Sequence, residues 1–494
     1  MATTTPPTSA GHPVGSASPS PSPSPSAEGR WAAPGPAAGE ALLAAIAAEL
    51  PDLRLLVDEA GREAHRRDET AYLATGLPLA VALPTTTEEV ATLVRLAAEH
   101  RTPVVPRGAG TGLSGGAVGV EGALTIAFTR MNRILEIDAD NLVAVVQPGV
   151  INADLKAAVE EQGLFYAPDP ASYETCTIGG NVGTNAGGLC CVKYGVTREA
   201  VLSLEVVLAD GSVIRTGGRN VKDAAGYSLT HLFVGSQGTL GLITEITVRL
   251  RPATPPKLTL LAFFPTLDAA GKAAAAITRA RISPVTFELM DQFTIVAVDE
   301  YQGLGLDRDA AAMLLLESDL PGAAAAEELD RAGAVCEEAG ATQVIRAADP
   351  QEADWLRQAR RMAHWALEAY GVSRMEDIVV PRASVPAMLR EIAVVAERHG
   401  VRIGTFGHVG DGNLHPSLVF DRDDPQAPEL TEAVRADLFR ATIALGGSVT
   451  GEHGIGASKR AWLEPQRGAD AVRIMRAIKD ALDPLGILNP GKVL

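Results

Sequence analysis

The sequence has few cysteines and no long apolar run, and these two absences exclude several classes of protein. Its 494 residues contain four cysteines, none of which stands in a C-x-x-C pair. A disulfide framework, a four-cysteine zinc site and an internal iron–sulfur cluster are therefore not expected, and the cysteine content favours a reducing, cytoplasmic compartment. No stretch reaches the roughly 18 apolar residues that a transmembrane helix requires, so no membrane span is expected.

Basic residues are scarce relative to acidic ones. Lys and Arg number 43 against 60 Asp and Glu, which gives a formal net charge of −17. This balance argues against a nucleic-acid partner, whose phosphates need a basic face, and against electrostatic docking on an anionic membrane. Hydrophobic residues at 46% and charged residues at 21% are typical of a globular protein, and the length predicts two or more domains.

Composition and hydrophobic periodicity divide the chain into four parts. Residues 1–39 are rich in proline and serine, contain no apolar signal-peptide core, and predict a disordered tail. Residues 40–252 form a first domain, which ends at the proline-punctuated segment 251–257. Residues 253–450 predict a second, α+β domain with an antiparallel sheet, and residues 451–494 predict a separate C-terminal segment.

The periodicity also predicts individual elements. Helices are expected at 41–50, 90–101 (after a capping box of Thr86 and Glu89), 267–281, 323–340, 350–370, 384–399, 428–446 and 468–483. Strands are expected at 77–84, 102–106, 123–129, 141–149, 240–250, 258–264, 285–290, 313–319, 376–381, 402–408 and 414–420, with a hairpin at 202–216.

Three glycine-rich segments are the first functional signal, at 106–116, 177–195 and 235–250. The first satisfies the G-x-G-x-x-G pattern of Rossmann folds, with Glu136 near the position of a ribose-binding acid. However, glycines and strand-like residues follow it, where glycine costs a helix about 1 kcal/mol at each position. We expect all three segments to adjoin strands, and to bind one large ligand through converging backbone N–H groups.

The segments PRGAGTG (106–112), PDPASYETCTIGGNVGTNAGG (168–188) and GTLGLITE (238–245) resemble the FAD-linked oxidase family, whose fold is of the vanillyl-alcohol-oxidase type. The chain most resembles the glycolate oxidase D-subunit and the D-lactate and D-2-hydroxyglutarate dehydrogenases, over residues 45–494. The resemblance implies a two-part FAD-binding domain, a substrate or cap domain, and a C-terminal segment that returns to the flavin. The residues it implies for FAD binding are Arg107, Gly108, Ala109, Gly110, Thr111, Gly112, Ser114, Pro168, Asp169, Thr177, Gly180, Asn181, Thr184, Asn185, Gly241 and Ile243. Some related enzymes attach FAD through a histidine in the first segment; since no histidine stands between 101 and 230, we expect non-covalent FAD.

Two histidines and a Glu-His pair predict a metal site. His408 and His415 lie on either side of a glycine-rich turn, where a hairpin would bring both imidazoles to one end of a sheet. Glu452 and His453 are adjacent in the segment 451–456. Two histidines and a carboxylate are typical of catalytic zinc sites, although manganese, iron or cobalt would also fit. The alternative for His408 and His415 is that they are core histidines hydrogen-bonded within the protein. The alternative for Glu452 and His453 is an ordinary glycine-rich start of a helix.

The 2-hydroxy-acid members of the family carry the motifs G-H-x-G-D-G-N-x-H and G-E-H-G-I-G, which these segments match. The resemblance implies that His408, His415 and Glu452 bind a divalent metal, that His453 is the catalytic base, and that Arg360 binds the substrate carboxylate. Arg361 is the fallback for Arg360. Met375 stands where the 2-hydroxyglutarate enzymes are expected to carry a lysine, so a second substrate carboxylate is not expected.

The predicted function is FAD-dependent oxidation of a small D-2-hydroxy acid, of the glycolate or D-lactate type, to the 2-keto acid. Hydride would pass to the flavin N5, and electrons would pass to a separate acceptor: a quinone, a cytochrome, an electron-transferring flavoprotein or an iron–sulfur subunit. The chain could form a homo- or hetero-oligomer. The alternatives are a metal-dependent hydrolase, which leaves the glycine segments unexplained, and a nucleotide-binding subunit with an inactive site.

Overall fold

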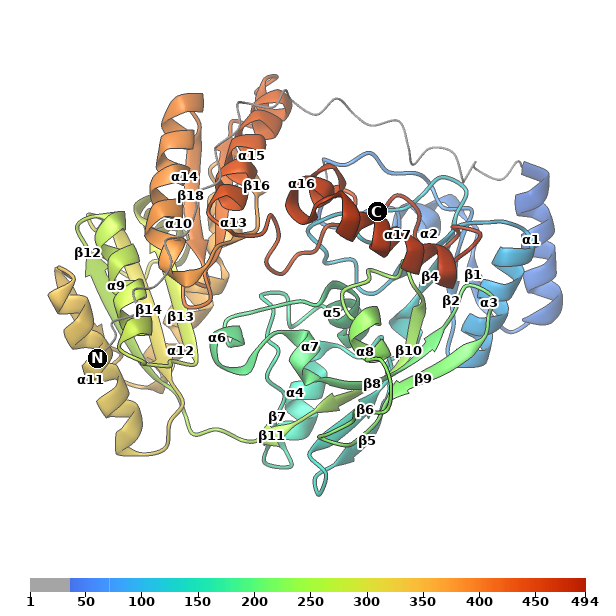
Figure 1. The fold of residues 1–494 in the computed structure, drawn as a ribbon, viewed down its shortest axis with the longest axis horizontal. Helices are drawn as coiled ribbons and strands as arrows, with labels where there is room; N and C mark the ends of the chain where they lie inside the picture. The colour runs from blue at the N-terminus through green and yellow to red at the C-terminus, as the bar shows by residue number, and fades with distance from the viewer. Residues whose placement is uncertain (1–35, 71) are drawn as a thin grey trace, which may run out of the picture.

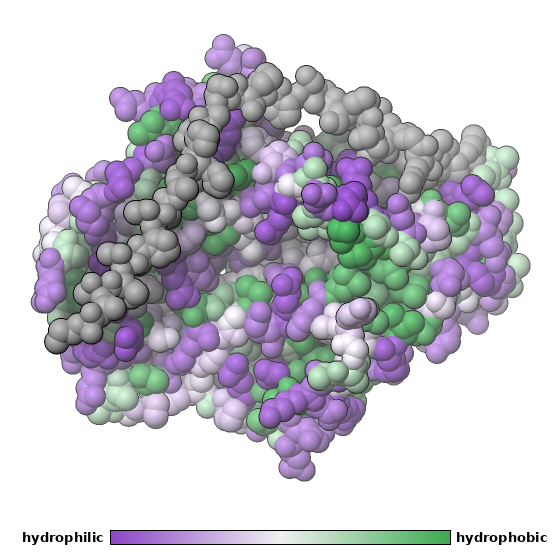
Figure 2. Space-filling view, in the orientation of Figure 1, coloured by the Kyte–Doolittle hydropathy of each residue, from purple (hydrophilic) through white to green (hydrophobic). Residues whose placement is uncertain are grey.

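The structure is a computed structural model that describes residues 36–70 and 72–494, so most of the predicted tail lies outside the described residues. Two smaller sheets come from the N-terminal half, and one large sheet with its helices comes from the C-terminal half (Figure 1). Within the described ranges, no helix combines the length and the apolar character needed to cross a bilayer. The face seen in Figure 2 is mostly hydrophilic, with hydrophobic residues gathered right of its centre.

The first sheet has the strand order β1-β2-β4-β3, in which β2, β4 and β3 run parallel and β1 is antiparallel to β2. Its elements are α1 (Pro36–Glu49), β1 (Arg54–Leu56), α2 (Glu59–Glu63), β2 (Ala80–Leu83), α3 (Thr87–Glu99), β3 (Val104–Arg107) and β4 (Leu124–Ala127). Residues 36–39, predicted to be disordered, form the first turn of α1. The helix α3 begins at the predicted cap, where Thr86 Oγ1 accepts from the Glu89 N–H, but the Glu89 carboxylate accepts from Thr85 N rather than Thr86 N.

The second sheet is antiparallel, with the order β5-β6-β10-β8-β9. Its strands are β5 (Ile134–Asp138), β6 (Val143–Val146), β8 (Val201–Val207), β9 (Val213–Gly217) and β10 (Leu242–Arg249). Around it lie α4 (Asn152–Glu160), α5 (Ile178–Thr184), α6 (Cys191–Tyr194), α7 (Thr197–Ala200), α8 (Leu229–Phe233) and the pair of short strands β7 (Leu164–Phe165) and β11 (Arg251–Pro252). The predicted hairpin at 202–216 is confirmed as β8 and β9, whereas β5 was not predicted.

The third sheet is antiparallel and has eight strands among the described residues, in the order β15-β12-β14-β13-β18-β19-β16, with β17 also paired to β19. Its strands are β12 (Leu258–Phe264), β13 (Thr286–Asp291), β14 (Ala312–Ser318), β15 (Gln343–Arg346), β16 (Val372–Met375), β17 (Ile378–Val379), β18 (Arg402–Gly407) and β19 (Asn413–Phe420). One face packs against α9 (Leu267–Arg279), α11 (Ala323–Glu338), α14 (Val385–His399) and α15 (Ala427–Ala444). The other face packs against α10 (Gln292–Gln302), α12 (Pro350–Arg361) and α13 (Ala363–Glu368).

Alternation along β12 shows why this sheet has two apolar faces. Leu260, Ala262 and Phe264 belong to the core on one face, and Leu261 and Phe263 belong to the core on the other. Successive side chains of a strand point to opposite faces, so a continuous apolar run predicts a strand covered on both sides. The predicted α+β class with an antiparallel sheet is confirmed.

Two predictions in the C-terminal half need correction. The single helix predicted at 350–370 is two helices, because α12 ends at Arg361 and α13 begins at Ala363. The strand predicted at 376–381 is replaced by β16 and β17, which leave Glu376 and Asp377 between them. The elements α10 and β15 were not predicted.

The C-terminal residues pack against the first two sheets (Figure 1). After α16 (Leu463–Arg467) and α17 (Ala469–Leu482), Val104 of β3 donates to the Ile487 carbonyl and accepts from the Asn489 N–H, both at 2.8 Å. Lys479 of α17 donates to the Thr239 carbonyl at 2.7 Å. The end of the chain is thereby held close to the glycine segments.

Candidate active site

The three glycine segments line one cavity of about 620 Å³, together with residues of α12, α13, β18 and β19. Thirteen of the residues predicted to bind FAD lie in its wall: Arg107, Gly108, Ala109, Gly110, Thr111, Gly112, Ser114, Thr177, Gly180, Asn181, Thr184, Gly241 and Ile243. The other three do not line it. The Pro168 carbonyl accepts from Asn152, the Asp169 carboxylate pairs with Arg361, and the Asn185 amide oxygen accepts from Arg198 N.

Arg107 brings a buried positive charge of the first glycine segment to the wall of the cavity. This side chain is buried, burial lowers its pKa, and it donates a long hydrogen bond of 3.5 Å to the Ala117 carbonyl. Gly110 has φ +84°, a conformation that favours glycine, and a Cβ there would lie 2.1 Å from the present position of Arg107 Nη2. The segment runs through turns into β4 rather than into a helix, and Glu136 is exposed and paired with Arg219, so the Rossmann alternative is wrong.

The second glycine segment was predicted to adjoin a strand, and this is wrong, because its first part is the helix α5. Glycine lowers the stability of a helix, but capping contacts stabilise both ends of α5. Thr177 Oγ1 accepts from the Gly180 N–H at 3.2 Å, and Asn185 closes the helix in the left-handed conformation with φ +59°. A Cβ added at Gly183, which lines the cavity, would meet no protein atom within 4 Å, so this helix leaves open space for a ligand.

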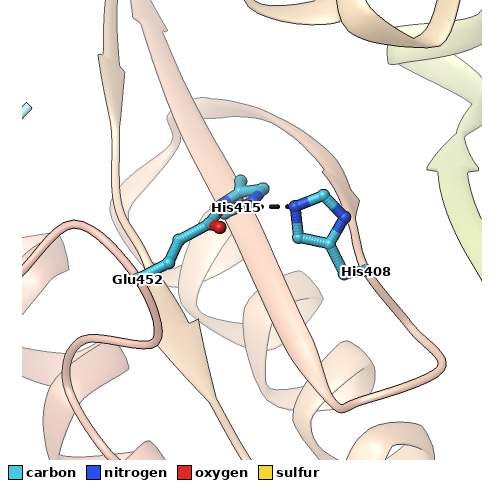
Figure 3. A group of neighbouring side chains, drawn as sticks. All are labelled: His408, His415 and Glu452. Atoms are coloured by element: carbon cyan, nitrogen blue, oxygen red, sulfur yellow. Dashed lines mark hydrogen bonds and ion pairs between the residues drawn. The ribbon is translucent and has the colours of Figure 1, made fainter. Parts of the chain in front are cut away.

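His408, His415 and Glu452 come together in the wall of the cavity, with their side chains pointing toward one another (Figure 3). Glu452 Oε1 lies 3.2 Å from His408 Nε2 and 3.3 Å from His415 Nε2, and one ligand atom from each residue lies within 4.8 Å of the others. The predicted hairpin of β18 and β19 carries the histidines, with His415 opposite Phe406. Two imidazole nitrogens and one carboxylate oxygen at this spacing fit a divalent cation.

Glu288 of β13 joins the predicted metal ligand His408 to the predicted substrate residue Arg360. Its Oε1 lies 2.7 Å from His408 Nδ1, and its Oε2 lies 2.6 Å from Arg360 Nη2. Burial lowers the pKa of His408, but Glu288 and Glu452 outweigh this, so that the pKa lies well above its ordinary value. A carboxylate on the far nitrogen of a metal-binding histidine fixes the orientation of the ring.

Arg360 is better placed than Arg361 to bind a carboxylate in the cavity. Arg360 is 4% exposed and lies over the Phe406 ring; its Nη2 pairs with Glu288 Oε2 at 2.6 Å, and its Nε has no hydrogen-bond partner. The Nη atoms of Arg361 instead donate to Asp169 and Pro170. A buried guanidinium with an N–H group that has no partner is suited to a charged acceptor.

His453 lines the same cavity, next to His415. Its ring stacks on that of His415 with centroids 5.4 Å apart and an interplanar angle of 7°. Burial lowers the pKa of His453, and the Asp377 carboxylate opposes this only in part. Ser114 Oγ of the first glycine segment donates to the His453 carbonyl at 2.8 Å, which ties the histidine to the wall of the cavity. The helix start proposed as an alternative for this segment is not found, because residues 451–456 contain turns but no helix.

Two buried carboxylates of the site were not predicted, Glu288 and Asp377. Both are at most 1% exposed. Glu288 interrupts the apolar strand pattern VTFELM. Asp377 directly precedes the apolar residues of EDIVV. Since a buried charge needs partners, an acidic residue within such a run was a usable signal of a polar site.

Comparison with known proteins identifies the family. Residues 78–217 match the family described as "FAD binding domain", and residues 255–493 match "FAD linked oxidases, C-terminal domain". The glycolate oxidase subunit GlcD of Bacillus subtilis (strain 168) is 45% identical over 435 residues, which are 88% of this chain and 92% of that protein. A D-lactate dehydrogenase of Archaeoglobus fulgidus is 37% identical over 437 residues, 87% of this chain and 96% of that protein.

Solved structures show the same fold at low sequence identity. p-Cresol methylhydroxylase with bound substrate aligns with a TM-score of 0.80 and 18% identity, over 93% of this chain and 97% of that chain. A 4-ethylphenol oxidase of Gulosibacter chungangensis aligns with a TM-score of 0.75 and 21% identity, over the same shares of the two chains. The predicted vanillyl-alcohol-oxidase-type fold is thereby confirmed.

The fold and the matched domains define a flavoprotein oxidoreductase. The chain belongs to the FAD-linked oxidase family, as the resemblance of its glycine segments predicted. The comparisons give no support to the metal-dependent hydrolase.

Proposed function

We propose that this protein oxidises a small D-2-hydroxy acid, of the glycolate or D-lactate type, to its 2-keto acid. The observation that carries the proposal is that Arg360, His453 and the group His408, His415 and Glu452 lie together in the wall of the cavity that the glycine segments line. The names of the glycolate oxidase subunit and the D-lactate dehydrogenase support this substrate class.

Each residue has a separate task in this proposal. Arg360 pairs with the substrate carboxylate and so fixes the orientation of C2. His453 accepts the proton of the 2-hydroxyl group as C2 is oxidised. Glu288 holds Arg360 and the His408 ring at a fixed separation. Arg360 and Glu288 are buried, and this burial limits the access of water to the substrate carboxylate.

FAD and a divalent cation are the groups that these residues would hold. FAD would lie along the cavity-lining glycine segments, and His408, His415 and Glu452 would hold zinc, with manganese or iron as alternatives. When bound, the flavin supplies the acceptor for the hydride equivalent, and the cation supplies a Lewis acid for the alcohol oxygen.

We further propose residues 40–252 as the FAD-binding domain, 253–450 as the cap domain with the metal site, and 451–494 as the segment that returns to the flavin. The matched ranges 78–217 and 255–493 support this division. Electrons would leave to a separate acceptor, since the Bacillus subtilis relative is named a subunit. The four cysteines, three of them buried and none in a disulfide, support a cytoplasmic location.

We expect FAD to be released by acid precipitation and to remain in the supernatant, because its binding is non-covalent. No histidine stands between 101 and 230, and burial raises the pKa of the cavity-lining Cys176, which makes its thiol a poor nucleophile. The measurement is the visible absorption of supernatant and pellet after precipitation. Flavin colour that stays with the pellet would contradict the prediction.

A substrate panel tests the proposed function: glycolate, D-lactate, L-lactate, D-2-hydroxyglutarate and D-malate, each with an artificial electron acceptor. We expect glycolate or D-lactate to give the highest kcat/KM, and the two dicarboxylates to give lower values. Met375, which lines the cavity, stands where a lysine would be expected for a second carboxylate, and the neighbouring cation Arg361 is paired with Asp169. Preferential oxidation of D-2-hydroxyglutarate would contradict the proposed substrate class.

A further inference from the structure

The loop that carries Glu452 and His453 is held by one buried carboxylate. Asp377 lies between β16 and β17 and is 0% exposed. Its Oδ2 accepts hydrogen bonds from three consecutive backbone N–H groups, those of Gly451 at 2.8 Å, Glu452 at 2.9 Å and His453 at 2.9 Å. Since residues 451–456 contain no helix or strand, these bonds take the place of regular secondary structure.

A fourth donor completes the surroundings of the same oxygen. Thr450 Oγ1 donates to Asp377 Oδ2 at 2.8 Å, so the loop presents four donors to a single acceptor. Four N–H and O–H groups that converge on one oxygen favour an anion there, because a carboxylate oxygen accepts hydrogen bonds more strongly than a neutral oxygen does.

The other oxygen of Asp377 contacts the strand that carries His415. Asn413 Nδ2 donates to Asp377 Oδ1 at 2.8 Å and also to the Ile378 carbonyl at 2.8 Å. The same Oδ1 lies 3.8 Å from His415 Nδ1. One side chain therefore bridges the loop of Glu452 and the strand of His415.

An asparagine at position 377 could not replace these contacts in either orientation. With its amide oxygen toward the loop, its NH₂ group would face Asn413 Nδ2. That nitrogen is also a donor, because it donates a hydrogen bond to the Ile378 carbonyl. With its NH₂ group toward the loop, it would face four donors. Each orientation leaves buried donors without an acceptor.

We propose that Asp377 is a positioning residue whose carboxylate fixes Glu452 and His453 relative to His415, and so sets the affinity of the His408, His415 and Glu452 group for a divalent cation. This inference rests on the proposed function, because it assumes that these three residues bind a metal. Asp377 itself acts through the loop, since its oxygens are occupied by Thr450, Asn413 and the three backbone N–H groups.

The test compares Asp377→Asn with Glu376→Gln in the full-length, FAD-loaded protein. Glu376 is the neighbouring residue, is 1% exposed, and pairs with Arg435 at 2.6 Å instead of with the loop. Each variant removes one buried negative charge, and the two positions are adjacent. Glu376→Gln therefore shows whether a loss of stability alone lowers the cation affinity. Zn²⁺ and Mn²⁺ affinities are measured by competition with a chromophoric chelator, and thermal unfolding is followed in parallel.

Asp377→Asn is expected to weaken cation binding by about 10–100-fold, the usual effect of removing a residue that orients metal ligands. Glu376→Gln is expected to lower the unfolding temperature but to keep the cation affinity of the unchanged protein. Equal cation affinities of Asp377→Asn and the unchanged protein would overturn the proposal for Asp377 alone. An unchanged protein that binds neither cation would overturn the metal site, and the proposal with it.

Thr450→Val provides the second variant if Asp377→Asn does not fold. It removes the hydroxyl group that contacts both Asp377 Oδ2 and the Gly454 carbonyl, and it leaves the carboxylate in place. We expect a smaller decrease of cation affinity in the same direction, and an affinity equal to that of the unchanged protein would overturn the proposal.

Discussion

Replacing His453 by asparagine is expected to lower the rate of flavin reduction by substrate about 10²–10⁴-fold, the usual contribution of a positioned general base. Asparagine keeps the approximate size of the side chain but cannot accept the proton of the 2-hydroxyl group. The backbone N–H of residue 453 still donates to Asp377, so the loop should keep its position. Flavin and metal contents should therefore stay close to those of the unchanged protein, while kcat falls.

His399→Asn is the matched control for His453→Asn. His399 ends α14 and lies 3.0 Å from Asp437, and it does not line the cavity. Stopped-flow mixing with substrate in the absence of oxygen measures flavin reduction in both variants directly. Near-normal reduction in His453→Asn would show that the base is another residue.

Replacing Arg360 by lysine is expected to lower kcat/KM about 10–100-fold, because a hydrogen bond to a charged group contributes about 1.5–3 kcal/mol. Lysine keeps the charge but not the planar pair of donors that a carboxylate accepts. The shorter reach of its ammonium group also weakens the contact with Glu288, which lies 2.6 Å from Arg360 Nη2. We expect the loss to appear mainly as a higher KM, measured in steady-state assays with glycolate and D-lactate.

Two further lysine variants assign this effect to one residue. Arg357→Lys changes the same helix one turn earlier, where the guanidinium pairs with Glu317 and does not line the cavity. It should leave KM unchanged. Arg361→Lys tests the fallback residue, whose guanidinium pairs with Asp169. A higher KM in Arg361→Lys, with a normal KM in Arg360→Lys, would assign the substrate carboxylate to Arg361.

The sequence predicted the strands and turns that a short stretch of residues determines by itself. The run LTLLAFF predicted β12 because burial on both faces makes a strand continuously apolar. The turn between His408 and His415 predicted the hairpin that brings the two rings to centroids 5.3 Å apart. The strand pattern failed for β5, whose exposed positions, among them Leu135 and Glu136, give it no continuous apolar run.

Other features depend on contacts between distant parts of the chain and could not be predicted from one sequence. Glu288 and His408 are 120 residues apart, and Asp377 and His453 are 76 residues apart. No periodicity specifies which buried acid meets which histidine. The helix α5 was missed for a different reason, because its glycines argue against helix while the capping contacts at its two ends favour it.

Substrate oxidation at this cavity should remove the C2 hydrogen of a 2-hydroxy acid and reduce FAD. The most direct test is to mix the FAD-loaded protein with glycolate or D-lactate in the absence of oxygen and of any added acceptor, and to record the visible flavin absorption. We expect loss of that absorption, formation of one keto acid for each flavin reduced, and slower reduction when C2 carries deuterium. Unchanged flavin absorption with every 2-hydroxy acid tested, in protein that retains FAD and metal, would contradict the proposed oxidation.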